Sequence, residues 1–418
     1  MTTRSIAMIN RRIMDGSVRV MSADEFCNFV REEGRDAITF DDIDVVTCGT
    51  RGIMSGTMAI LSFPVSRPDT FVRAIDVRLN GIPAFPGPCP NERLGVLDLV
   101  VYGTAHNGDY GGGDLFRDLV DGHSITVEIT SSDGKQIDTT IRLDEIPFAR
   151  MVGVRNAFKN YMAFVNTTEC EVSSIFSTLP LKGSLKELTF SGCGEINPLE
   201  NDPHLDTIGV GTRILMNGAE GFVEGVGTRS TWEKPNLSGF ADMHDMNPIY
   251  MGGFKTSAGP EVINSWAIPI PVLNEQILEN LKKLNHEIPL KVVDVHGRIP
   301  IGEITYADVW NQDLSTTFDP DACIDCEKCP VDEFCPTHAF SIALKQIDRN
   351  RCFNCGSCSL ICTAGAFSGD NGSVRIGSRD IPIVCRQSDL CGGVKIAKEL
   401  KKRIMDGSFL LNEPVPFR

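Results

Sequence analysis

The sequence predicts an α+β fold, in which a large N-terminal region of mixed sheets and short helices precedes a small cysteine-rich domain. Three observations support this prediction. The chain has 418 residues, which is enough for two to three domains of ordinary size. Short alternating apolar segments and a few helical patterns continue to about residue 310. Eight of the 15 cysteines then fall between residues 323 and 362.

The composition is that of a soluble globular protein. Apolar residues make up 42% and charged residues 23%, which excludes a disordered chain. With 40 basic and 55 acidic residues the formal net charge is −15, which argues against nucleic acid or an anionic membrane as a partner. We recognise neither a membrane-spanning stretch nor a secretion signal, so we expect a cytoplasmic protein with reduced cysteines.

The first elements have clear signals. Ser22 and Glu25 form a capping-box pattern, which predicts a helix up to about Glu33 that ends at Gly34. Residues 43–47 then predict a strand. It leads into a glycine-rich segment at residues 48–56, which we expect to be a loop.

Further along, four prolines in residues 79–93 predict irregular structure. Three glycines, Gly111, Gly112 and Gly113, precede an amphipathic stretch at residues 114–120. Residues 124–130 alternate in polarity as a strand does.

The second half predicts short strands joined by tight turns. We expect the following elements: strands at 207–211, 213–216 and 221–224, a helix at 275–284, a strand pair at 290–294 and 299–304, and a terminal helix at 393–405 that folds back on the core. A linker at residues 315–321 divides the chain. The predicted domains are residues 1–315, a cysteine-rich domain at 316–370, and a C-terminal tail with its helix at 371–418.

Two short repeats occur. Arg-Ile-Met-Asp-Gly-Ser appears at residues 12–17 and 403–408, which predicts a shared helix ending with glycine after the last turn. Gly-Val-Gly-Thr-Arg appears at 209–213 and 225–229, and Gly-Thr-Arg at 49–51. A glycine turn beside an arginine can hold an anion, although plain turn chemistry produces the same pattern.

The strongest motif is a pair of cysteine quartets. The second quartet has the spacing Cys-x2-Cys-x2-Cys-x3-Cys of bacterial two-cluster ferredoxins, in which the fourth cysteine binds the other cluster. We therefore assign Cys323, Cys326, Cys329 and Cys362 to one [4Fe–4S] cluster, and Cys352, Cys355, Cys358 and Cys335 to the other. Structural zinc is the alternative, but zinc sites need only four sulfurs and usually pair Cys-x2-Cys units.

The two quartets also indicate an internal duplication. The first three cysteines recur at an offset of 29 residues (323→352, 326→355, 329→358) and the fourth at 27 (335→362). Phe340 and Phe367 occupy matching positions after the fourth cysteines, so we expect them to cover the two clusters symmetrically.

Among the other cysteines, Cys48 and Cys193 have the most suggestive contexts. Cys48 follows a buried-type strand beside Arg51, and Cys193 sits in a Ser-Gly-Cys-Gly turn. Glycines and a nearby cation can lower the pKa of a thiol, so both are candidate catalytic residues. The alternative for each is an unreactive buried thiol.

Residues 1–310 resemble a known family. The resemblance rests on these segments: 9–13, 45–50, the glycines at 111–113, 156–161, 201–203, 207–213 and 268–275. Together they resemble the homocysteine-biosynthesis family of archaea and anaerobic bacteria. With a fused ferredoxin, the chain is most similar to its branch of methanogenesis marker 16 metalloproteins.

The resemblance implies sulfur chemistry on a small substrate. The better understood branch is an L-aspartate semialdehyde sulfurtransferase that uses a cysteine persulfide and a ferredoxin-like partner. Its loop carries cysteine in a Met-Cys-Ser-Ser-Gly context, whereas this chain reads Met54-Ser55-Gly56. Thiol chemistry would therefore fall to Cys48 and Cys193. The residues expected to bind a small anionic or aldehyde substrate are Gly49, Thr50, Arg51, Ser55, Gly111, Gly112, Gly113 and Arg213.

Three functions fit these features. The first is a redox protein whose clusters pass electrons to a site in residues 1–315 or to a redox or maturation partner, in sulfur metabolism or in maturation of a methanogenesis enzyme. The second is a sulfurtransferase with a relocated cysteine. The third is a non-catalytic assembly factor whose clusters only stabilise the tail.

Overall fold

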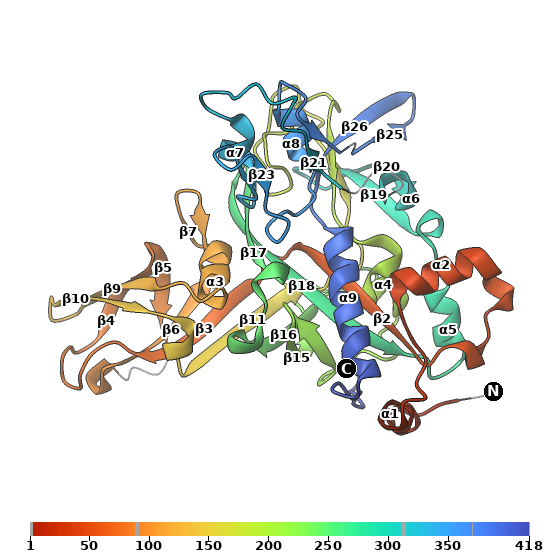
Figure 1. Ribbon diagram of the computed structural model, residues 1–418, viewed down its shortest axis with the longest axis horizontal. Helices are drawn as coiled ribbons and strands as arrows, with labels where there is room; N and C mark the ends of the chain where they lie inside the picture. The colour runs from red at the N-terminus through yellow and green to blue at the C-terminus, as the bar shows by residue number, and fades with distance from the viewer. Residues whose placement is uncertain (1–2, 88–91, 311–314, 370, 418) are drawn as a thin grey trace.

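The computed structural model describes residues 3–87, 92–310, 315–369 and 371–417. It is a mixed α/β protein with 23% helix and 35% strand. Figure 1 shows three parts: a broad sheet at the base, a helical layer against its right half, and the cysteine-rich region above.

The base is a 14-stranded sheet in the order β1-β2-β18-β14-β15-β16-β11-β3-β6-β5-β4-β9-β10, with β17 paired to β18. Its strands are β1 Val20–Ser22, β2 Val45–Ile53, β3 Thr57–Pro64, β4 Ala74–Leu79, β5 Ile82–Pro86, β6 Val96–Tyr102, β9 Ile125–Ser131, β10 Gln136–Ile141, β11 Phe148–Asn156, β14 Arg213–Met216, β15 Ala219–Val226, β16 Leu237–Asp242, β17 Gly252–Thr256 and β18 Gly259–Pro271. Strands β2 and β18 pair antiparallel over nine residues, and both are almost wholly buried.

A second sheet of six strands follows the order β20-β19-β12-β13-β26-β25. Its strands are β12 Ala163–Val165, β13 Leu188–Phe190, β19 Pro289–Asp294, β20 Pro300–Thr305, β25 Ser373–Ile376 and β26 Arg379–Arg386. Because β26 pairs parallel with β13, the chain returns to the body of the protein after the cysteine-rich segment.

The helices mostly cover edges and faces of these sheets. They are α1 Ile6–Asp15, α2 Ala23–Glu33, α3 Gly112–Val120, α4 Pro198–Asn201, α5 Glu275–Leu281, α6 Ala307–Trp310, α7 Pro330–Phe334, α8 Ser357–Ile361 and α9 Leu390–Met405. Helix α9 packs across β2 and β18 (Figure 1). A Cβ at Gly49 of β2 would overlap the carbonyl oxygen of Gly393 in α9, so this close packing requires glycine at position 49.

The cysteine-rich segment contains little regular structure. Apart from α7 and α8, it has two short ladders, β21 Thr317–Phe318 with β24 Phe367–Ser368 and β22 Phe340–Ser341 with β23 Gln346–Ile347. The remaining ladder, β7 His106–Asn107 with β8 Tyr110–Gly111, is a small hairpin near α3. Within the described residues, no helix is long and apolar enough to cross a membrane.

Several sequence predictions are confirmed. Helix α2 has the expected capping box and ends at Gly34. Strands β9, β14, β15, β19 and β20 lie where the sequence predicted strands, and β19 pairs with β20. The repeated Arg-Ile-Met-Asp-Gly-Ser segments both end helices, α1 and α9, with Gly16 and Gly407 in the left-handed region. The predicted terminal helix exists and packs on the core, although it begins at Leu390.

Three predictions are wrong. Residues 48–53 are not a loop, because β2 runs through them and its glycines accommodate a packed helix instead of a turn. Residues 79–93 are not wholly irregular, because Pro83 and Pro86 lie within β5. Residues 207–211 do not form a strand; only Val210 makes an isolated bridge, with Val415. The predicted irregularity around Cys89 lies outside the described residues.

Candidate functional site

Two small cavities in the cysteine-rich segment are each lined by four cysteines. One is lined by Cys323, Cys326, Cys329 and Cys362, and the other by Cys335, Cys352, Cys355 and Cys358. Each cavity thus takes three closely spaced cysteines from one quartet and the fourth cysteine from the other quartet. Among the described residues, no three His, Cys, Asp or Glu side chains form a group that could hold a single metal ion.

The backbone around the cysteines repeats with the offsets of the sequence. Asp325 and Asn354, which are 29 residues apart, both have left-handed φ, at 51° and 52°. His338 and Gly365, which are 27 residues apart, do so as well, at 51° and 69°. Helices α7 and α8 each end immediately before the fourth cysteine of their quartet. The duplicated sequence therefore folds into two matching cysteine loops.

The second cavity holds its thiols in the neutral form. Burial is the main cause that raises the pKa of Cys352 to about 11, and neighbouring Cys355 and Cys335 add to the effect. The pKa of Cys355 is raised first by a hydrogen bond with Cys385 and then by burial. Four crowded thiols, of which Cys355 is buried and the other three are half-buried, are poor anions on their own. A cationic core at the centre would reverse that balance, because a coordinated thiol is deprotonated.

The two cavities have different surroundings. Phe318, Phe340 and Phe367 form a triad with ring centroids 4.8–4.9 Å apart, and all three line the first cavity. The expected symmetric covering by Phe340 and Phe367 is therefore wrong, because neither ring lines the second cavity. That cavity lies against the body of the protein, where Phe353 stacks edge-on to Phe254 at 5.1 Å.

An apolar cluster joins the second cavity to the large sheet. Phe353 and Cys355 are buried there with Cys385 and Phe254, and Ile53 at the end of β2 packs against them. The backbone N–H of Arg386 donates a hydrogen bond to the Cys355 carbonyl at 3.0 Å. The next residue, Gln387, accepts from the N–H of Ile53 through its own carbonyl. The cysteine loop is therefore fixed to the end of β2.

A buried ion pair strengthens this junction. Arg51 Nη1 donates to Asp389 Oδ2 at 2.7 Å, and the two side chains are 6% and 2% exposed. The other carboxylate oxygen of Asp389 accepts from Asn354 Nδ2 at 3.3 Å. The Arg51 guanidinium also lies 5.5 Å from the ring centroid of Phe353. Arg51 thus positions the second cysteine loop and is part of the protein interior.

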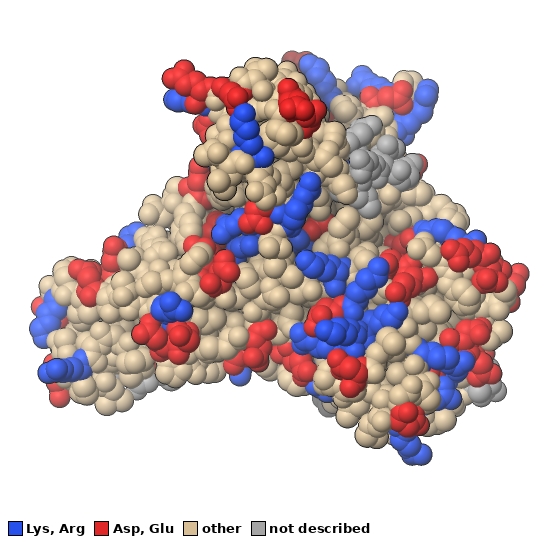
Figure 2. Space-filling view, in the orientation of Figure 1, with Lys and Arg blue, Asp and Glu red and all other residues tan. Residues whose placement is uncertain are grey.

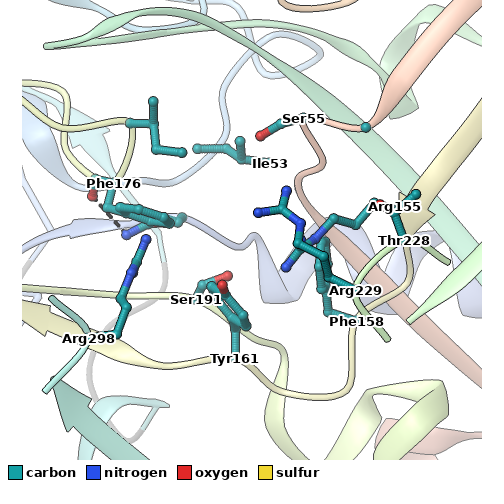
Figure 3. A pocket seen from close by; sticks show the side chains of 13 residues that line it. Ile53, Ser55, Arg155, Phe158, Tyr161, Phe176, Ser191, Thr228, Arg229 and Arg298 are labelled. Carbon is teal, nitrogen blue, oxygen red and sulfur yellow. Dashed lines mark hydrogen bonds between the residues drawn. The ribbon is translucent and has the colours of Figure 1, made fainter. Parts of the chain in front are cut away.

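A separate pocket of about 250 Å³ opens beside Ile53 (Figure 3). Polar side chains reach it from several elements: Ser55 after β2, Arg155 in β11, Ser191 after β13 and Arg298 before β20. Its thirteen lining residues are Ile53, Ser55, Gly56, Arg155, Phe158, Tyr161, Ile175, Phe176, Ser191, Thr228, Arg229, Arg298 and Gln387. Ile53 is both a pocket residue and a member of the apolar cluster beside Cys355.

Of the predicted substrate residues, Ser55 alone is among those that line this pocket. Gly49, Thr50 and Arg51 are buried in β2. Gly111 precedes α3, and Gly112 and Gly113 are its first residues. They serve close packing, because a Cβ at Gly112 would overlap the Tyr102 carbonyl oxygen. Arg213 pairs with Glu220 and lies 4.5 Å from the ring centroid of Phe409.

The two candidate catalytic cysteines are fully buried. Cys48 and Cys193 are each 0% exposed, and burial raises the pKa of both thiols, to about 11 for Cys193. Cys193 donates to the Arg51 carbonyl oxygen at 3.8 Å and accepts from the Thr50 hydroxyl at 3.6 Å. Neither cysteine lines the pocket. A catalytic role for them stays a prediction, and their burial weighs against it.

Sequence reasoning missed most of the pocket. Arg155 and Arg298 carry no local motif, because distant segments bring them together. Phe158 and Tyr161 lie in segment 156–161, which carries part of the family resemblance, but they were not predicted as site residues. Arg229 had a signal, since it ends the second Gly-Val-Gly-Thr-Arg repeat. Glu261 was also missed. It is 5% exposed, burial raises its pKa, and the Ser55 hydroxyl forms a hydrogen bond with it.

Residues 18–411 match a family model described as "Homocysteine biosynthesis enzyme, sulfur-incorporation". An uncharacterised protein of Methanothermobacter thermautotrophicus is 49% identical over 412 residues, covering 98% of this chain and 94% of the relative. An uncharacterised protein of Methanocaldococcus jannaschii is 43% identical, covering 95% of this chain and the whole relative. No solved structure matches the chain.

More distant similarity reaches proteins with a described activity. The L-aspartate semialdehyde sulfurtransferase of Methanosarcina acetivorans is 30% identical over 329 residues. The alignment covers 74% of this chain and 63% of that enzyme.

Proposed function

The chain belongs to the homocysteine-biosynthesis, sulfur-incorporation family, and from that premise we propose that it is an iron–sulfur redox protein of sulfur metabolism or methanogenesis-enzyme maturation. It holds two [4Fe–4S] clusters and couples them to a small-substrate site at the end of β2. The first cluster is bound by Cys323, Cys326, Cys329 and Cys362. The second is bound by Cys352, Cys355, Cys358 and Cys335.

The cysteine cavities carry this proposal. Each has four sulfurs around an enclosed space, and the fourth sulfur comes from the opposite quartet, as in two-cluster ferredoxins. Structural zinc would require four sulfurs that converge on one ion at about 2.3 Å. Thiols that surround a cavity fit a larger inorganic core better. Such clusters supply single electrons at low potential when bound.

The surroundings of the cavities favour one direction of electron flow. Ile324 lines the first cavity and is 68% exposed, so that cavity lies near the surface. The second cavity faces inward, and Ile53 extends from its apolar surroundings to the pocket. A redox or maturation partner would therefore dock near the first cavity, and the substrate would bind beyond the second.

Relatives that are L-aspartate semialdehyde sulfurtransferases favour sulfur transfer as a second candidate. It would need an accessible nucleophilic thiol, because the thiolate is the reactive form. The two candidates, Cys48 and Cys193, have 0% exposure and raised pKa values. Those properties favour the redox proposal over sulfur transfer by these residues.

Anaerobic purification of the full chain tests the proposal. We expect about eight iron and eight sulfide per chain, together with a reducible absorption near 400 nm. Cys323→Ser and Cys352→Ser should each lower the iron content by about half, because each affects one cluster. Cys170→Ser is the matched control, since Cys170 is exposed and lies outside both cavities. Zinc in place of iron in the purified protein would contradict the proposal.

A further inference from the structure

The pocket beside Ile53 is strongly cationic in an acidic protein. Three of its lining residues are arginines, Arg155, Arg229 and Arg298, and none of its lining residues is acidic. Within the described residues, none of the three has a carboxylate within ion-pair distance, although the chain carries a net charge of −15. On the visible surface, by contrast, acidic and basic side chains are interspersed (Figure 2). Acidic groups near the pocket are Glu261, which is hydrogen-bonded to Ser55, and Asp294, whose charge acts on Arg298. The pocket therefore carries more positive than negative charge.

Aromatic rings hold two of these guanidinium groups. The Arg298 guanidinium lies 4.5 Å from the ring centroid of Phe164 and 4.3 Å from that of Phe176. Arg155 lies 5.3 Å from the ring centroid of Phe158. Stacking fixes the plane of a guanidinium and leaves its N–H edge free for a planar anion. One nitrogen of each, Nη1, is buried without a hydrogen-bond partner.

The backbone supports the same interpretation. Arg229 and Arg298 both have left-handed φ values, 58° and 57°. This region is strained for a residue other than glycine, and such residues cluster at ligand sites. Both come from loops, one between β15 and β16 and the other between β19 and β20. The strained conformations direct both side chains into one pocket (Figure 3).

The cations lie on opposite sides of the pocket. Figure 3 shows Arg155 and Arg229 together on one side and Arg298 on the other, with Ser55 and Tyr161 between them. Arg155 and Arg229 repel each other, and the pKa of Arg155 is lowered by burial and by the neighbouring charge of Arg229. A ligand with negative charge at both ends would relieve this repulsion at each side.

We propose that this pocket binds a small molecule with an anionic group at each end, of the dicarboxylate class. One carboxylate would lie between Arg155 and Arg229, and the other would face Arg298. The pocket volume of about 250 Å³ limits the ligand to a few carbon atoms between the two groups. The role of this ligand as the substrate of the redox reaction rests on the proposed function. Its binding in the pocket does not depend on the proposed function.

Calorimetry on the anaerobically purified holoprotein tests the proposal, with iron and sulfide measured on the same sample. Succinate should bind at least about tenfold more tightly than butyrate, which has the same carbon chain and one carboxylate. Arg229→Gln and Arg298→Gln should each weaken succinate binding by about tenfold or more and leave butyrate less affected. Arg78→Gln, at an exposed ion pair on β4, should bind succinate normally.

Equal binding of succinate and butyrate would overturn the proposal, as would normal succinate binding by both arginine variants. Inorganic phosphate binding as tightly as succinate would also overturn it, because that result indicates a single-anion site. Arg229 is exposed, so its variant should fold normally and give an interpretable result even where Arg298→Gln does not. If the unsubstituted protein carries both clusters but does not bind succinate, this inference alone is refuted. If the clusters are missing from the purified protein, the proposed function is refuted.

Discussion

The Arg51–Asp389 ion pair should be worth far more than any surface ion pair of this protein. Replacing Arg51 by Met keeps a long apolar side chain against Phe353 but leaves the Asp389 carboxylate, 2% exposed, without its cation. Removing one partner of a buried ion pair costs about 3–5 kcal/mol. The Arg78–Asp76 pair, with side chains 47% and 54% exposed, should lose about 1 kcal/mol or less in the matched Arg78→Met variant.

Urea titration of the holoprotein, followed by tryptophan fluorescence under anaerobic conditions, measures both effects. The double variant Arg51→Met with Asp389→Asn should recover part of the lost free energy of unfolding, because no unpaired charge stays buried. Asp389 also contacts Asn354, so Arg51→Met should perturb the spectrum of the second cluster before that of the first. If Arg51→Met costs no more than Arg78→Met, the assignment of Arg51 to the protein interior is refuted.

Three further predictions follow from burial and packing. Burial lowers the pKa of Lys234 to about 8, and its ammonium lies 5.5 Å from the Tyr161 ring centroid at the pocket. The ammonium loses its charge as the pH rises through that value, so succinate affinity should fall between pH 7 and 9, and Lys234→Met should remove this dependence in calorimetry. Gly49→Ala should destabilise the protein by about 2 kcal/mol or more in urea titration, because its Cβ overlaps α9. Alkylation of the native protein, mapped by mass spectrometry, should label Cys170 and spare Cys48 and Cys193.

For each of these three predictions, one result would contradict it. If the succinate affinity is constant from pH 7 to 9, Lys234 does not contribute to the positive charge that binds the ligand. Gly225→Ala, where an added Cβ meets nothing within 4 Å, is the control for Gly49→Ala, and equal stability of the two variants would contradict the packing argument. Rapid labelling of Cys193 in the folded protein would restore it as a candidate nucleophile.

Local features were predictable from the sequence. The capping box of α2, the glycine ends of α1 and α9, and the alternation in β9 depend on residues a few positions apart. The grouping of the cysteines was predictable for the same reason, because both quartets lie within 40 residues of chain. The structure groups the cysteines four and four around two cavities, as that pattern predicted, and the binding of a cluster by each group stays a prediction.

Long-range packing was not predictable in this way. Glycines at 49 and 52 predicted a loop, yet they lie in a buried strand, because Gly49 faces a helix that follows more than 300 residues later in the chain. The pocket has the same origin: Arg155, Arg229 and Arg298 belong to three separate segments. A local pattern can indicate a turn or a strand, but it carries no information about which distant cations will share a cavity.

The position of Ser55 connects the family relationship with the chemistry proposed. The resemblance described in the sequence implies a cysteine in this loop for the sulfurtransferase branch, whereas here a serine faces the pocket beside three arginines. A serine hydroxyl cannot store sulfur as a persulfide, so the pocket itself supplies charge and shape. Reactivity must then come from elsewhere, and Ile53 brings the second cysteine cavity to the pocket wall. A reaction that depends on electrons at a bound dianion fits this arrangement better than one that depends on a thiol.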